Sequence, residues 1–296
     1  MAARRRKPPR RGRLWAGRVP PYAALARLYD AWMGESFDYP AWADQIEGWI
    51  ERHAPDLVRP WTIVDLACGT GRLSQLLAER GHTVVGTDRS PAMLRIARQR
   101  TRPGERLAFR RRDLRRGASG LSRRFDVALC LCDSLNYLLD RRSVGRVFAR
   151  AAQAVRPGGL LIFDVNTVFQ LAHGYGDRSI WGRRPECAYL WRNAFDPRRR
   201  RVEIRLALRW THPSPRRWSA RRGPHTAVEI HREQAHSARA LERLARRAGW
   251  HVLARYDGLT DAPPRWDSDR ITWVLGRRPR RPGPRLQPSA SPGTPG

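Results

Sequence analysis

The stretch from Ile63 to Asp88, "IVDLACGTGRLSQLLAERGHTVVGTD", constrains the fold more than any other part of the chain. An apolar run over 62–66 predicts a buried strand, and the glycine turn after it opens an amphipathic helix over 71–80. A second apolar run over 83–87 predicts another strand, which ends on Asp88. A strand, a crossover helix and a second strand in so short a span predict two parallel strands in one sheet.

The same alternation extends over most of the chain. Helical spacing of apolar residues predicts helices over 21–33, 40–53, 142–155 and 237–248, and a further helix with Ser90 as its N-cap. Further strands are expected at 107–110, 125–131, 160–165, 250–256 and 270–276, with a turn at 156–159, "RPGG". Strands that alternate with helices predict an α/β fold, a parallel sheet with helices on both faces.

One region breaks this alternation. The stretches 188–195, 201–211 and 226–233 alternate apolar and polar residues with a period of two, as half-buried antiparallel strands do. We therefore expect a small antiparallel insertion, bounded at 181–234, within a main domain that spans 19–278. The end segments 1–18 and 279–296 are basic or rich in Pro and Gly, and are expected to be disordered tails.

The net charge is extreme, because 58 Lys and Arg against 27 Asp and Glu give +31. Such a balance favours nucleic acid or another polyanion as a partner. Lys7 is the only lysine, however, so the arginines also fit a general bias towards this residue type. The alternative is an arginine-rich surface that is simply solvated.

The sequence also indicates a compartment. No apolar run reaches the 18 residues of a membrane span, and no apolar segment follows the basic N-terminus as in a secretory signal. The cysteines at 68, 130, 132 and 187 form no CxxC pair and are expected to be reduced thiols, neither disulfides nor metal ligands. These features predict a cytoplasmic protein with no membrane partner and no metal; they do not determine the oligomeric state.

The glycine turn distinguishes two kinds of cofactor. A dinucleotide site uses G-x-G-x-x-G, whose third glycine allows close packing and leaves room for a pyrophosphate. Here Gly69 and Gly71 are present, but Ser74 takes the third position and Asp65 ends the preceding strand. A carboxylate there would repel a pyrophosphate, yet it attracts an ammonium group such as that of S-adenosylmethionine.

Later strands also end in polar residues. Asp88 lies 23 residues after Asp65, where a carboxylate can accept both hydroxyls of a ribose. Asp113 follows the third strand and can accept from an adenine amino group, while Leu114 can offer its backbone N–H to the ring. The fourth strand ends in "LCDSLNY", 131–137. Because the carboxyl ends of parallel strands meet in one crevice, these groups are expected to face one ligand.

The motifs "VDLACGTG", "VVGTDRSPAML", "RRDL" and "CDSLNYL" together resemble those of the class I S-adenosylmethionine-dependent methyltransferases. The resemblance extends from about Tyr22 to Arg277. "RPGGLLIFDVNT" and "EIHREQAHSARALERLARRAGW" resemble a bacterial branch with an antiparallel insertion after strand five. This resemblance implies a Rossmann-like sheet of seven strands, the last of them antiparallel, and S-adenosyl-L-methionine as cofactor.

The resemblance also implies a set of cofactor contacts. Gly69 and Gly71 would let the backbone approach the methionine moiety, and Asp65 would help to hold its amino group. The other residues implied at this site are Tyr29, Ala67, Cys68, Asp88, Arg89, Met93, Asp113, Leu114, Cys132 and Asp133. Simpler roles remain as alternatives: turn glycines, a helix cap for Asp88, a loop acid for Asp113, and ordinary core packing for Met93, Cys132 and Tyr29.

Methyl transfer depends mainly on positioning and exclusion of water, and needs a base only where the nucleophile starts protonated. Glu229, His231 and Glu233 share one strand face, which makes His231 a candidate base; the alternative is a solvated outer face. Candidate substrate contacts are Asn136, Tyr137, Asn166 and Trp191. The "DSLNY" motif lacks the N-P-P-[YF] or D-P-P-[YF] signature of enzymes that methylate planar amino groups, which argues against a base-flipping enzyme.

We therefore expect a methyltransferase that acts on an O or N nucleophile of a small molecule held under the insertion. One alternative is an RNA methyltransferase that uses its arginines on phosphates. Grouping of the arginines of 198–201 and 216–222 at the mouth of the crevice would favour it. A non-enzymatic protein that binds the cofactor or nucleic acid is a further alternative, and a nicotinamide-dependent dehydrogenase is disfavoured by Ser74.

Overall fold

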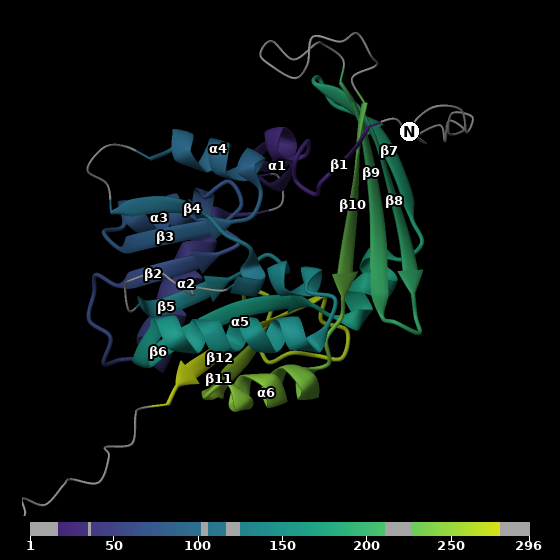
Figure 1. Cartoon of the computed structure of the whole chain (residues 1–296). Helices are drawn as coiled ribbons and strands as arrows, with labels where there is room; N and C mark the ends of the chain where they lie inside the picture. Colours follow the sequence, from purple (N-terminus) through teal and green to yellow (C-terminus); the bar gives the residue numbers. More distant parts are fainter. Residues whose placement is uncertain (1–16, 35–36, 102–105, 117–124, 211–225, 279–296) are drawn as a thin grey trace, which may run out of the picture.

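The computed structural model describes residues 17–34, 37–101, 106–116, 125–210 and 226–278, which form two β-sheets (Figure 1). The larger sheet has seven strands in the order β11-β12-β6-β5-β2-β3-β4. The smaller sheet has five, in the order β1-β10-β9-β8-β7. The predicted α/β fold, a seven-stranded sheet with an added antiparallel sheet, is confirmed.

The larger sheet is parallel over five of its strands. β4, β3, β2, β5 and β6 pair in parallel in that order, while β12 runs antiparallel to both β6 and β11. β2, β3 and β5 are buried over almost their whole length, which accounts for their continuous apolar runs. The bounds are β2 Thr62–Leu66, β3 Thr83–Asp88, β4 Leu107–Arg111, β5 Phe125–Cys130, β6 Val155–Asn166, β11 Trp250–Asp257 and β12 Arg270–Arg277.

Helices cover both faces of this sheet. On one face the core contains Phe148 of α5 and Leu241 of α6; on the other it contains Trp49 of α2 and Leu77 of α3. The helices are α1 Ala26–Gly34, α2 Tyr39–His53, α3 Arg72–Glu79, α4 Pro91–Gln99, α5 Arg141–Ala154 and α6 Ala238–Arg247. Short helical turns occur at Leu114–Arg116 and Ser134–Tyr137, and a π-helical segment occurs at Gln170–Tyr175.

The smaller sheet contains the predicted insertion and two strands that the sequence pattern does not predict. β8 Cys187–Asp196, β9 Arg201–Trp210 and β10 Thr226–Gln234 match the three alternating stretches within about one residue at each end. The unpredicted strands are β7 Ser179–Arg183 and β1 Arg18–Val19, which pairs in parallel with β10. The tail expected at 1–18 thus reaches the sheet at Arg18, whereas 1–16 and the tail 279–296 lie outside the described residues.

Two predicted boundaries differ from the structure. The "RPGG" segment is part of β6 rather than a turn before it, and β6 pairs with β5 across a register shift. The first helix begins at Ala26 instead of residue 21, because the N–H groups of Tyr22, Ala24 and Leu25 donate to the carboxylate of Glu229. These N–H groups have found a side-chain acceptor, so the helix starts after them.

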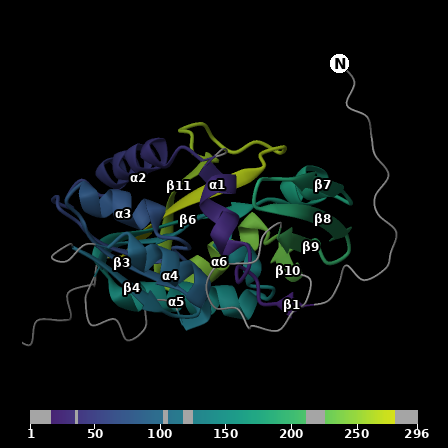
Figure 2. The same ribbon diagram turned by 90° about the horizontal axis from the view of Figure 1, so that it is seen from above.

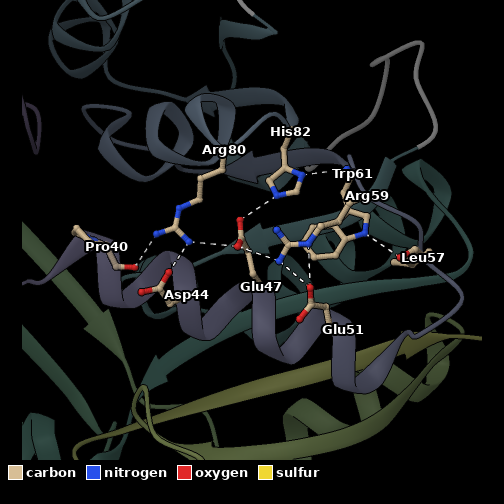
Figure 3. A network of polar contacts seen from close by, with 9 residues as sticks. All are labelled: Pro40, Asp44, Glu47, Glu51, Leu57, Arg59, Trp61, Arg80 and His82. Atoms are coloured by element: carbon tan, nitrogen blue, oxygen red, sulfur yellow. Dashed lines mark hydrogen bonds and ion pairs between the residues drawn. The ribbon is translucent and has the colours of Figure 1, made fainter.

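A buried acid fixes α2 to the larger sheet (Figure 3). The Glu47 carboxylate accepts from His82 Nε2 at 3.0 Å and from Arg59 Nη2 at 3.0 Å. His82 Nδ1 accepts the N–H of Trp61 at 3.0 Å, so the ring proton lies on Nε2. Because α2 contributes side chains to the cavity described below, this network holds one of its walls in place.

Candidate active site

A cavity of about 350 Å³ opens at the carboxyl ends of β2, β3 and β5, the edge at which open α/β sheets bind ligands. Tyr22 and Tyr29, from the N-terminal segment, close one side of it. Every residue implied at the cofactor site lines the cavity except Gly71 and Asp133. The lining members of that set are Tyr29, Asp65, Ala67, Cys68, Gly69, Asp88, Arg89, Met93, Asp113, Leu114 and Cys132.

The two glycines of the loop after β2 have different tasks. Both adopt left-handed backbone, with φ of 57° at Gly69 and 76° at Gly71. A Cβ on Gly69 would meet no atom within 4 Å, so its backbone is open to a ligand. A Cβ on Gly71 would lie 2.5 Å from Cζ of Phe109 on β4. Gly71 therefore permits close packing of α3, and it does not line the cavity.

Asp88, the last residue of β3, holds the glycine loop. Its Oδ2 accepts the N–H of Gly69 at 3.1 Å and its Oδ1 accepts the N–H of Ser90 at 2.7 Å. The cap of α4 is Ser90 itself, since its Oγ accepts the N–H of Met93 at 3.3 Å. Burial raises the pKa of Asp88 although both N–H groups act to lower it. The carboxylate is thus more than a helix cap, and it lies in the cavity wall.

Asp65 is a buried acid at the end of β2. Ser74 Oγ donates to its Oδ2 at 2.5 Å, and burial raises the pKa of the carboxyl to about 6. Ser74 occupies the position of the third glycine of a dinucleotide site. The serine at this position therefore provides the hydrogen bond that orients Asp65. An acid with a raised pKa in a cavity is typical of a binding site, because a cationic ligand would stabilise the carboxylate.

The segment after β4 supplies the third acid. Asp113 pairs with Arg115 at 2.6 Å, and a hydrogen bond from that guanidinium holds the pKa of Asp113 at about 2. The carboxylate is therefore ionised at any physiological pH. Leu114 follows it on the cavity wall, so both predicted adenine contacts lie together in the structure.

Three wall residues hold left-handed backbone although they are not glycine: Tyr22 at φ 61°, Ala67 at φ 63° and Cys132 at φ 53°. Such conformations cost on the order of 1–3 kcal/mol each and gather at binding sites. Each of the three lies in a turn, and each lines the cavity. Their grouping marks this cavity as the functional site independently of the acids.

Asp164 of β6 imposes the turn after β5. Its carboxylate accepts the N–H of Cys132 at 2.9 Å and that of Asp133 at 2.5 Å. Arg270 of β12 donates to Asp164 at 3.1 Å and to the Asp133 side chain at 2.7 Å. The Asp133 side chain therefore points towards a partly buried ion pair with Arg270, and it does not line the cavity.

The N-terminal segment is tied to the glycine loop. Asp30 of α1 accepts from Thr70 Oγ1 at 2.5 Å and forms an ion pair with Arg100, the residue that follows α4. Seen from above, α1 lies between the two sheets (Figure 2). These bonds hold Tyr29, the residue before Asp30 on α1, at the cavity wall.

His231 lies on β10 with Glu229 and Glu233, and all three side chains are buried, so the alternative of a solvated face for these residues is wrong. The ring lies between two partners: Nε2 is 2.9 Å from Oε2 of Glu229, and Nδ1 is 2.9 Å from the hydroxyl of Tyr137. Tyr137 lines the cavity, whereas His231 stands behind it. The predicted base would therefore have to act through Tyr137.

The other predicted substrate contacts lie away from the cavity wall. Asn136 is fully buried, and its Nδ2 donates to the carbonyls of Asn166 at 3.0 Å and Gln234 at 3.1 Å. The Nδ2 of Asn166 donates to Glu233 at 3.0 Å. Trp191 packs among the apolar side chains of the smaller sheet. These two amides join the two sheets.

Sequence reasoning missed four groups that shape the site: Tyr22, Asp164, Arg270 and the anchoring role of Glu229. A signal exists for Asp164, since it is the one acid inside the apolar strand "LLIFDV". Tyr22 and Arg270 carry no such signal, because each reaches the site from a distant part of the chain.

Residues 63–159 match a family model described as a methyltransferase domain. The chain is 34% identical over 172 residues to the putative methyltransferase YqeM of Bacillus subtilis, a match that covers 58% of this chain and 66% of that protein. It is 28% identical over 257 residues to the putative methyltransferase GWCH70_2453 of Geobacillus sp., covering 86% of this chain and 98% of that protein. The chain belongs to the class I S-adenosylmethionine-dependent methyltransferases.

Solved methyltransferases share the fold over nearly the whole described chain. A crystal structure of an S-adenosylmethionine-dependent methyltransferase from Clostridium acetobutylicum superposes with a TM-score of 0.74 at 24% identity, covering 87% of this chain and 99% of that chain. The sugar N-methyltransferase KedS8 from Streptoalloteichus superposes with a TM-score of 0.65 at 20% identity, covering 84% and 92%. The smaller sheet therefore belongs to the shared architecture.

The cavity of this methyltransferase fits S-adenosylmethionine by its donor and acceptor groups. Asp65 offers a carboxylate to the ammonium group, beside backbone at Gly69 that no side chain covers. Asp88 and Asp113 offer carboxylates at the ends of the next two strands, as the ribose and adenine require. In the described part of the chain, no helix has the length and apolar character of a membrane span.

Proposed function

We propose that the protein transfers the methyl group of S-adenosylmethionine to an oxygen or nitrogen nucleophile of a small molecule. The observation that carries this proposal is the asymmetry of the cavity. One part is lined by strand-end acids suited to the cofactor, and another by the phenols of Tyr22 and Tyr137 beneath the smaller sheet. A nucleophile would enter at the phenols.

The protein's contribution is to bind and orient the two reactants. Asp65 and Gly69 would hold the methionine end, and Asp88 and Asp113 the nucleoside end. The bound cofactor supplies an electrophilic methyl group on a sulfonium. The N-terminal segment, held by Asp30 to Thr70 and Arg100, would exclude water from the reactants.

The similarity in fold to KedS8, described as a sugar N-methyltransferase, supports a small polar acceptor. A cavity of about 350 Å³ is in the range of small-ligand sites.

Calorimetric titration of nucleic-acid-free protein with S-adenosylhomocysteine tests the cofactor half. We expect micromolar binding, weakened about 100-fold or more in Asp88→Ala, because charged hydrogen bonds contribute about 1.5–3 kcal/mol each. Asp196→Ala is the matched control, since Asp196 pairs with Arg199 in an exposed turn away from the cavity. Absence of binding by the wild type would overturn the proposal. A mass-spectrometric screen of small amines and alcohols for methylated product then tests the acceptor half.

RNA is a second candidate acceptor, because an arginine-rich groove adjoins the cavity. The groove, of about 1680 Å³, shares Arg89, Arg112, Asp113 and Arg115 with the cavity wall. Among the described residues its one acid, Asp113, is paired with Arg115. Its arginines are Arg27, Arg89, Arg95, Arg111, Arg112, Arg115, Arg116 and Arg146. Two groups of arginines, in 198–201 and 216–222, were expected to distinguish RNA from a small molecule. The second group lies outside the described residues. From the first group, Arg201 donates to the carbonyl of Leu139, which lines the cavity.

Fluorescence anisotropy with a labelled single-stranded RNA tests this candidate. An RNA enzyme should bind it with a salt slope of about −0.7 for each phosphate contacted. The double variant Arg95→Ser/Arg116→Ser should bring that slope closer to zero. A small-molecule enzyme should show no such binding near physiological salt, and the variant should leave S-adenosylhomocysteine affinity unchanged.

A further inference from the structure

Four side chains form a continuous hydrogen-bonded chain from the cavity into the smaller sheet. The hydroxyls of Tyr22 and Tyr137 lie 2.6 Å apart on the cavity wall. Tyr137 is 2.9 Å from Nδ1 of His231, whose Nε2 is 2.9 Å from Glu229. We propose that this chain is a proton relay, in which Tyr137 takes the proton of the methyl acceptor as its own proton passes to His231. The inference rests on the proposed methyl transfer and assigns its proton path.

The geometry fixes the direction of each hydrogen bond. The Glu229 carboxylate accepts from the N–H groups of Tyr22 at 2.7 Å, Ala24 at 2.6 Å and Leu25 at 2.9 Å. Since an ionised carboxylate only accepts, its fourth partner, His231 Nε2, must carry a proton. In the neutral ring Nδ1 is then an acceptor, so Tyr137 donates to it. The Tyr137 oxygen keeps lone pairs for Tyr22 and for a group in the cavity.

The charge states suit a relay that ends on the imidazole. Burial raises the pKa of Glu229, but His231 and the N–H groups of Leu25 and Ala24 outweigh it and bring the pKa below its ordinary value. Burial raises the pKa of Tyr137 and of Tyr22 well above the usual range, so both phenols stay neutral. Tyr137 therefore passes a proton on rather than keeping a negative charge.

The step balances with these groups alone. The acceptor's lone pair forms the new bond to the methyl carbon, and the pair of the broken carbon–sulfur bond stays on sulfur. The acceptor's proton moves to the Tyr137 oxygen while the hydroxyl proton moves to His231 Nδ1. The resulting imidazolium faces the Glu229 carboxylate, and it returns to neutral by losing a proton to water after product release. In this scheme Tyr137 is the catalytic residue, and His231 and Glu229 act through it.

Other charged groups stand near the relay and must be separated from it. Burial raises the pKa of Asp133 to about 6 and the pKa of Glu233 well above its ordinary value, and both acids raise the pKa of Tyr22 and of Tyr137. Arg270 pairs with Asp133, and Tyr175 is near Glu233. The test therefore observes the His231 ring directly.

The test is ¹⁵N NMR of the histidine rings. The His231 resonances should show a proton on Nε2 and a hydrogen-bonded lone pair on Nδ1, and Tyr137→Phe should shift the Nδ1 resonance towards that of a free lone pair. Tyr256→Phe removes a hydroxyl that contacts His53 and should leave the His231 resonances unchanged. A proton on Nδ1 of His231 overturns the relay.

These outcomes are distinct from failure of the proposed function. If the wild type does not bind S-adenosylhomocysteine, methyl transfer itself is contradicted; if it binds this ligand and His231 carries its proton on Nδ1, only the relay is. With an acceptor in hand, Tyr137→Phe should lower kcat by about 10²–10⁴-fold at unchanged S-adenosylhomocysteine affinity. An unchanged kcat would refute the assignment of Tyr137.

Discussion

Asp65 in the larger sheet and Glu229 in the smaller sheet are both buried carboxylates, yet they are held in opposite ways. Asp65 has the hydroxyl of Ser74 as donor, and burial raises its pKa to about 6. Glu229 has three backbone N–H groups and the His231 ring, and its pKa falls despite burial. The first is a carboxylate left for a ligand to stabilise, and the second is one that the fold has already stabilised.

This difference separates the tasks of the two sheets. The larger sheet supplies the groups proposed to bind the cofactor, so these polar groups face the cavity. Their burial destabilises the ligand-free protein. The smaller sheet anchors the N-terminal segment and supports Tyr137, so its polar groups are satisfied within the protein. Loss of the acid should therefore destabilise the fold at Glu229 and stabilise it at Asp65.

Glu229→Gln should give the largest change. Donors surround both carboxylate oxygens, so the amide NH₂ must face an N–H whichever way it is turned. We expect the free energy of unfolding to fall by about 3 kcal/mol in urea unfolding at pH 7.5. Glu242→Gln on α6, where the acid pairs with Arg246 at the surface, is the matched control. Equal losses in both variants would remove the distinction between Glu229 and an ordinary acid.

Asp65→Asn should act in the opposite direction. An acid whose folded pKa is raised binds its proton more tightly in the folded state, so wild-type stability falls as pH rises from about 4 to 6. The variant lacks this loss and should be more stable by about 2–3 kcal/mol at pH 8, and by only about 1 kcal/mol at pH 4.5. It should also bind S-adenosylhomocysteine more weakly. The measurement is urea unfolding of the ligand-free proteins at both pH values; a destabilised variant at pH 8 would contradict the assignment.

Glu203→Gln should give the smallest change. Glu203 lies on the outer face of the smaller sheet and pairs with Arg205 at 2.7 Å and Arg232 at 2.8 Å, both about half exposed. Such surface pairs contribute about 0–1 kcal/mol, and salt weakens them further. Thermal unfolding at 50 and 500 mM salt should show a small difference that vanishes at high salt. A large effect would mean that the outer face of this sheet is as organised as its inner face.

The parallel half of the fold was predictable because its signals are local. Continuous apolar runs mark β2, β3 and β5, and each acid follows its own strand, so Asp65, Asp88 and Asp113 could be placed in one crevice. Contacts with partners that are distant in the sequence could not be predicted. Gly71 packs against Phe109, and Asp133 turns to Arg270, which is 137 residues away.

The sequence by itself determined the α/β architecture, the antiparallel insertion and the ends of the strands that line the cavity. Backbone periodicity and turn chemistry act over a few residues, and they suffice for these features. Only the tertiary structure decided that Glu229 and His231 face inward, that Tyr22 and Tyr137 meet, and that Asn136 joins the two sheets. Those contacts arise where the sheets meet, so no pattern within either segment encodes the partner that each buried polar group requires.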